Sequence, residues 1–122
     1  MRMTVSPIRF PFPDPRLSPN KRIHRLYLTR VREDARQIGY WIAKDAGWSF
    51  SGKKTLELKI TICPPDRRKR DDDNIYSSFK SYRDGIFKAL ELDDSLVSRT
   101  VLERGKVEKD GALYVALSEI KP

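Results

Sequence analysis

The chain has 122 residues, a formal net charge of +8, 39% hydrophobic residues and 34% charged residues. This length fits a single domain, residues 1–122, with one modest core. No run approaches the 20 or so apolar residues of a membrane span and no signal peptide is recognisable, so we expect a cytoplasmic protein with no membrane partner. The excess of positive charge favours a polyanionic partner.

The first elements lie on either side of a proline-rich loop. Residues 4–10 predict a short strand, and the four prolines between positions 11 and 19 forbid regular structure after it. The loop carries Phe12, Lys21 and Arg22, with Phe10 just before it. Two interpretations stay open: an arm whose cations bind DNA and whose aromatic rings contact unstacked bases, or a plain connection whose rings pack in the core.

A helix is predicted from about residue 21 to residue 46, where Gly47 would end it. Apolar residues recur there at steps of three and four, forming the stripe Tyr27, Val31, Ala35, Ile38, Ile42 and Ala46. Residues 54–62 alternate between apolar and polar, which predicts a half-buried strand. Cys63 at its end is the single cysteine, so an intrachain disulfide and a cysteine zinc cluster are excluded.

A second helix is predicted to begin near Asp73, with the apolar stripe Ile75, Phe79, Tyr82, Ile86 and Leu90. Residues 97–107 and 112–120 predict two more strands, and Asp110-Gly111 between them predicts a hairpin. The order is therefore β-α-β-α-β-β. It predicts an α+β (α/β) fold in which a mixed sheet of about four strands is packed by two main helices.

The most unusual segment reads Pro-Asp-Arg-Arg-Lys-Arg-Asp-Asp-Asp-Asn, from Pro65 to Asn74. Clustered cations bind phosphate, whereas clustered carboxylates bind divalent metal ions through hard oxygen ligands. The segment thus predicts a site that holds a nucleic-acid backbone against a metal. Its predicted DNA-binding residues are Arg67, Arg68, Lys69 and Arg70.

The predicted metal ligands are Asp71, Asp73 and Asp94. If the chain is still extended at the junction of loop and helix, side chains two apart point to the same side, so Asp71 and Asp73 reach one ion. Asp94, after the second helix, would bring a third carboxylate to it. Three carboxylates without His or Cys suit Mg²⁺ or Mn²⁺ rather than zinc. An alternative stays open, because Asp residues at a helix start also cap free N–H groups.

Helix geometry places Lys80 and Ser77 on the face of Asp73, away from the apolar stripe. Lys80 is therefore predicted to stabilise charge that develops on a phosphoryl oxygen.

The run from Pro65 to Asn74, the helix after it and Leu92-Asp93-Asp94 together resemble the signature of RusA-type Holliday junction resolvases. The segment from Leu17 to Asn20 and the helix that follows it also match that family. The resemblance implies a dimeric, Mg²⁺-dependent endonuclease with a small α/β fold, which cuts four-way DNA junctions by symmetrical paired nicks. It also implies Asp71, Asp73 and Asp94 as the metal ligands, and Asp72 as a variable position.

The chain departs from the family at Ser77, where a catalytic lysine often stands four residues after the second motif Asp. Because Lys80 lies one turn further along the same face, we expect it to take that role. Two other functions stay open: a non-catalytic protein that binds branched DNA, and a broader nuclease acting on flaps or forks.

Overall fold

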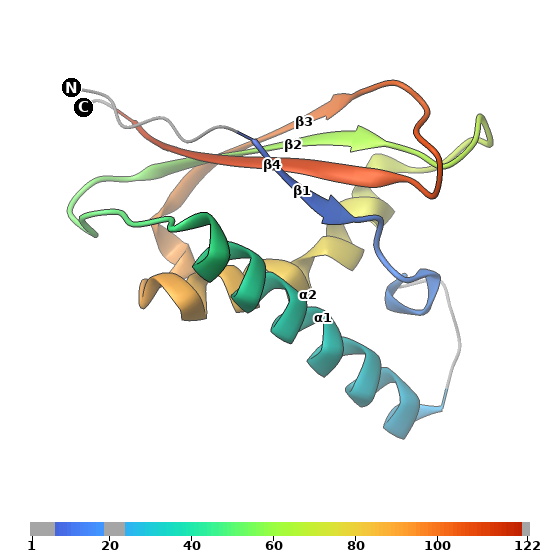
Figure 1. Ribbon diagram of the computed structural model, residues 1–122, viewed down its shortest axis with the longest axis horizontal. Helices are drawn as coiled ribbons and strands as arrows, with labels where there is room; N and C mark the ends of the chain where they lie inside the picture. Colours follow the sequence, from blue (N-terminus) through green and yellow to red (C-terminus); the bar gives the residue numbers. More distant parts are fainter. Residues whose placement is uncertain (1–6, 19–23, 121–122) are drawn as a thin grey trace.

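The protein, described by a computed structural model over residues 7–18 and 24–120, has two layers. One layer is a mixed four-stranded sheet and the other consists of two helices on one face of it (Figure 1). The predicted fold class is confirmed. Lys21 and Arg22, two of the predicted DNA-binding residues, lie outside the described residues. In order, the elements are β1 (Ile8–Pro11), η1 (Pro15–Leu17), α1 (Arg25–Ala46), β2 (Leu56–Cys63), α2 (Asp72–Leu90), η2 (Asp94–Leu96), β3 (Val97–Arg104) and β4 (Ala112–Glu119).

The sheet has the strand order β1-β4-β2-β3, so β4 and β2 are its interior strands. The predicted alternation of β2 is confirmed, because its four apolar side chains are at most 1% exposed: Leu56, Leu58, Ile60 and Ile62. β2 pairs antiparallel with β4 and parallel with β3, and α2 is the crossover between β2 and β3. This crossover carries the chain from the end of β2, beside the basic segment, to the level of the start of β2, and the parallel β3 then returns it to that end.

The predicted hairpin between the last two strands is wrong. β3 pairs with β2 alone among the described strands, and the chain passes over the end of β2 to reach β4 on the other side. Gly105 N–H donates to the Ile62 carbonyl (2.8 Å) and Glu108 N–H to the Pro64 carbonyl (3.0 Å) along this path. The Asp110-Gly111 turn does exist, with φ of 65° and 71°. A turn reverses the chain locally, whereas partner choice is decided here by the apolar β2, which takes a neighbour on each side.

The two helices cross at a pair of glycines. A Cβ added at Gly39 would overlap the carbonyl of Tyr82, and one at Gly85 would overlap the carbonyl of Arg36. The backbones of α1 and α2 are therefore in direct contact. No larger residue fits this crossing without moving a helix.

The close crossing rotates the buried face of α1 away from the predicted stripe. Its buried residues are Val31, Ala35, Gly39 and Ala43. Tyr27 and Ile38, predicted to face the core, are 60% and 38% exposed, so that part of the prediction is wrong. The hydropathy pattern followed large apolar residues, whereas the real contact uses small ones.

The stripe predicted for α2 is confirmed, with Ile75, Phe79, Tyr82 and Ile86 buried and Leu90 partly buried. Phe10 of β1 is fully buried, with its ring centroid 5.8 Å from that of Tyr82. For Phe10 the packing alternative is therefore correct. None of the helices in the described ranges is both long and apolar enough to span a membrane.

Candidate nucleic-acid interface at the start of α2

Three connecting segments meet at one end of the sheet, at the right of Figure 1. They are residues 12–18 after β1, residues 64–71 before α2, and residues 105–111 between β3 and β4. They border a cavity of about 760 Å³ together with the first turns of α2. Its lining includes Phe12, Asp14, Arg68, Lys69, Arg70, Asp71, Asn74, Tyr82 and Asp110.

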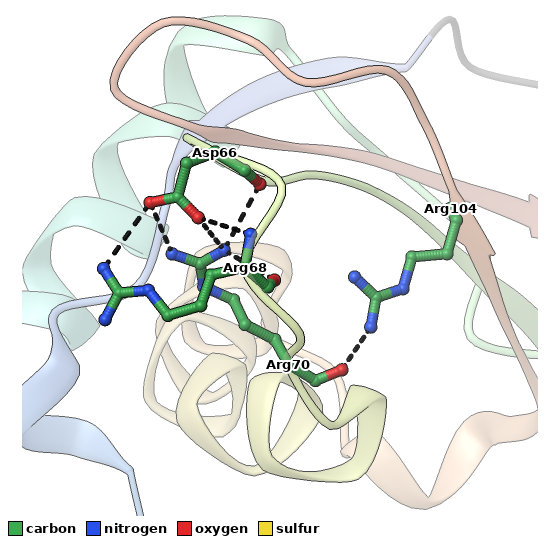
Figure 2. A network of polar contacts seen from close by, with 4 residues as sticks. All are labelled: Asp66, Arg68, Arg70 and Arg104. Carbon is green, nitrogen blue, oxygen red and sulfur yellow. Dashed lines mark hydrogen bonds and ion pairs between the residues drawn. The ribbon is translucent and has the colours of Figure 1, made fainter.

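Asp66 organises the basic segment from within (Figure 2). Its Oδ1 accepts hydrogen bonds from the Arg68 N–H (2.8 Å) and from Arg70 Nη1 (2.8 Å), and its Oδ2 accepts from Arg70 Nη2 (3.2 Å). These bonds, led by that of the Arg70 guanidinium, lower the pKa of Asp66 to about 2. Arg70 Nη1 also donates to the Arg68 carbonyl (3.2 Å), and its guanidinium lies 5.7 Å from the ring centroid of Phe12.

The four predicted DNA-binding cations of the basic segment therefore divide into two kinds. Arg70, with its side chain 20% exposed, is engaged inside the fold. Arg67, Arg68 and Lys69 are exposed. Arg68 has one loose ion pair with Asp66, at 3.6 Å and with 78% of its side chain exposed, and in the described part of the chain Arg67 and Lys69 have none. These three cations are available to bind phosphate.

The three successive aspartates at the start of α2 also differ in their surroundings. Asp71 is the N-cap, since its Oδ1 accepts from the N–H of Asp73 (2.9 Å). Asp72 Oδ1 lies 2.6 Å from Nη2 of Arg104. The same nitrogen donates to the Arg70 carbonyl at 2.5 Å, a bond that Figure 2 shows. Asp71 and Asp73 are exposed, whereas Asp72 is half-buried. Asp72 is therefore used to fasten α2 to the end of β3.

Lys80 is exposed on α2, on the face of Asp73 and seven residues beyond it, which is about 10 Å along the helix axis. Ser77, one turn after Asp73, is partly buried. The expected shared face is therefore present. Neither side chain lines the cavity at the start of α2.

Asp94 lies at the other end of α2, as the first residue of η2. Arg83 holds it there: Nη2 donates to the Asp94 carbonyl (3.4 Å) and lies 3.8 Å from its Oδ2, while Nη1 donates to the Tyr76 hydroxyl (3.2 Å). Asp94 lines a second cavity, of about 680 Å³, whose charged residues are Lys44, Asp84, Lys88, Glu91, Asp93 and Asp94.

The convergence of Asp71, Asp73 and Asp94 on one metal ion stays a prediction. Across residues 7–18 and 24–120, no three Asp, Glu, His or Cys side chains lie in a group able to hold a metal ion.

Asp71 and Asp73 still offer the hard oxygen donors that Mg²⁺ prefers, with the second oxygen of Asp71 not needed by the cap. They make only part of an ion's ligand set. Their surroundings, a helix N-terminus and several cations, attract anions instead. Because Mg²⁺ is commonly held by one or two carboxylates together with water molecules and substrate phosphates, the two residues fit part of its ligand set.

Arg104 is the residue of this site that the sequence did not reveal. It stands 32 residues after Asp72, at the end of β3, and no local pattern connects the two. The strand order alone brings them together.

Comparison with known proteins identifies a relative. An uncharacterized protein of Xylella fastidiosa (strain Temecula1) is 36% identical over 117 residues, which covers 93% of this chain and 76% of that protein. The chain belongs to the same family as this protein. No protein-family model matches the chain. Since the alignment spans nearly all of the chain, the relative shares the fold, and the basic segment lies within the aligned length.

Proposed function

We propose that the chain is a Mg²⁺-dependent endonuclease, with Mn²⁺ able to substitute, that cuts four-way DNA junctions by paired nicks. The observation that carries the proposal is the start of α2, where the exposed carboxylates of Asp71 and Asp73 directly follow three exposed cations. Cations that hold a phosphate backbone beside carboxylates that hold a divalent ion form the combination used in metal-assisted phosphodiester hydrolysis. The resemblance to RusA-type resolvases supports a branched DNA substrate.

The proposed active form is a twofold dimer. Two nicks need two sites, and a twofold dimer matches the symmetry of a junction. The two ends of α2 complement each other, since exposed cations surround its start while Asp84, Glu91, Asp93 and Asp94 gather near its end. In an antiparallel pair of α2 helices, Asp94 of one copy would face Asp71 and Asp73 of the other. This arrangement would bring a third carboxylate to the ion held by Asp71 and Asp73.

Each residue then has a distinct role. Bound Mg²⁺ would supply activation of a water molecule and stabilisation of the leaving oxygen. Asp71 and Asp73 hold the ion through carboxylate oxygens while Asp71 keeps its cap. Lys80, on the face of Asp73, neutralises charge on a phosphoryl oxygen, and Ser77 is the competing candidate. The phosphates on either side are held by Arg67, Arg68 and Lys69.

The direct test is incubation with a synthetic four-way junction in Mg²⁺ or in EDTA, scored for symmetrical nicks. Asp71→Asn should slow cleavage more than about a hundredfold. This loss is larger than the one typical when a residue that only hydrogen-bonds to a metal ligand is replaced. Because Asn caps helices as well as Asp does, folding and junction binding should persist. Asp93→Asn is the matched control, since Asp93 caps η2 in the same way through the Ser95 N–H (2.8 Å). Metal-independent cutting, or no cutting at all, would refute the proposal.

The dimer is tested by mixing two inactive variants, Asp71→Asn and Asp94→Asn. If each site combines both copies, the mixed dimer contains one intact site and regains single-strand nicking. If each site lies within one copy, every site in the mixture carries one substitution and the mixture stays inactive.

A second candidate function is non-catalytic binding of branched DNA. It is favoured by the structural uses already found for two of the acids, since Asp71 caps α2 and Asp72 pairs with Arg104. In that case wild type and Asp71→Asn both bind the junction and neither cuts it. A broader flap or fork nuclease would instead cut those substrates as fast as the junction.

A further inference from the structure

The cavity at the start of α2 has features beyond those needed to hold phosphates. Its walls combine aromatic surface from Phe12, the guanidinium of Arg70 beside that ring, and polar groups from Asp14 and Asn74. Exposed Arg68 and Lys69 stand at the same cavity. At about 760 Å³ it falls within the size range of pockets that take small organic ligands.

Two buried residues with hydroxyl groups, Ser78 and Tyr82, line this cavity. The Ser78 hydroxyl donates to the Asn74 carbonyl (2.9 Å), and Tyr82 is only 3% exposed. Burial, and then the nearby charge of Asp14, raise the pKa of Tyr82 to about 12, so the hydroxyl stays protonated. A tyrosine hydroxyl both donates and accepts hydrogen bonds, so it suits a ligand with hydrogen-bonding edges.

We propose that this cavity binds one unpaired nucleotide of a DNA strand. The base lies inside, beside Phe12 and Arg70 and within reach of the Tyr82 hydroxyl, and its flanking phosphates contact Arg68 and Lys69. Aromatic rings and guanidinium planes stack on any base, and the polar wall meets the exposed base edge. The inference rests on the proposed function for its biological substrate, because strand exchange points in a junction offer unstacked nucleotides. The prediction that the cavity binds a nucleotide does not depend on whether the protein cuts DNA.

The test compares two labelled 15-nucleotide single strands of equal charge, one with bases and one built entirely from abasic units. Binding is measured by fluorescence anisotropy in EDTA, so cleavage plays no part. Wild type should prefer the strand with bases about tenfold, in keeping with the worth of one stacked base. Phe12→Ala should bring this ratio close to one, and Tyr82→Phe should lower it to about threefold, by removing only a hydroxyl.

Tyr114→Phe is the matched control, because its hydroxyl donates to Glu108 Oε1 (2.6 Å) and the residue does not line the cavity. It should keep the tenfold ratio. Equal binding of the two strands by wild type would overturn the inference, and so would a ratio that Phe12→Ala and Tyr82→Phe leave unchanged. If instead only the endonuclease proposal is wrong, wild type keeps the tenfold ratio but does not cut junctions in Mg²⁺.

Discussion

The two ends of α2 present opposite chemistry. At its start, Asp66 and Arg104 hold a loop whose remaining cations are exposed, beside a cavity that contains Phe12. At its end, four acidic residues gather around a second cavity, partly balanced by Lys44, Lys88 and Arg83. The helix dipole favours anions at the first end and disfavours them at the second. Hence the first end is suited to bind anions, whereas the second end carries an excess of acidic side chains.

This contrast changes how the acidic motif is understood. Asp71 and Asp73 lie at the start of α2, whereas Asp94 follows its end as the first residue of η2. The same helix gives two copies of the chain complementary ends. The contrast thus supports a site completed by a second copy, and the experiments below test the parts on which it depends.

The largest effect is expected from a substitution that disrupts the close packing of α1 against α2, which fixes the position of both ends of α2. In Gly85→Ala the new methyl group overlaps the Arg36 carbonyl, so α1 and α2 must separate. We expect a loss of about 2–3 kcal/mol in the free energy of unfolding, measured by denaturant titration. Asp84→Ala, at the exposed neighbour on α2, should change it by less than about 0.5 kcal/mol. Equal stability of Gly85→Ala and wild type would mean that the helices do not touch there.

A smaller effect should separate the cations at the two ends. Arg67→Gln and Lys69→Gln should each weaken DNA binding several-fold and each reduce the slope of log affinity against log salt by about one. Lys44→Gln and Lys88→Gln, which remove the same charge at the second cavity, should leave the slope unchanged. Similar losses from all four variants would indicate a general effect of net charge and remove the distinction between the ends.

The sequence predicted what depends on neighbours along the chain. The alternation of β2 and the stripe of α2 are periodic over many residues, and the structure follows both. The sequence did not predict the features that depend on contacts between segments distant along the chain. The pairing of β4 with β2 depends on competition among strands, and the buried face of α1 depends on two glycines that a hydropathy pattern does not count.

The candidate site divides in the same way. The basic segment and the exposed acids that follow it were predictable, because they adjoin in sequence. That Arg70 is the cation held inside was not, since nothing in the run Arg67–Arg70 distinguishes its members. Only the folded loop brings Arg70 onto Asp66 and Phe12. The position of Asp94 depends likewise on Arg83, whose long side chain gave no signal.

The smallest effect concerns acid, and it tests whether Asp66 orders the basic segment at the start of α2. Its pKa falls from an ordinary 3.8 to about 2 on folding, so its contribution is complete above pH 4 and is lost as the pH falls towards 2. The measurement is the carboxyl carbon shift of Asp66 in NMR, followed with pH. Asp66→Asn should remove this dependence and increase exchange of the Arg68 amide proton, which Asp66 otherwise binds. A midpoint near 4 in the folded protein would show that Arg70 is not held by this carboxylate. All four cations of the run would then be available to DNA, and the division between Arg70 and the other three would be lost.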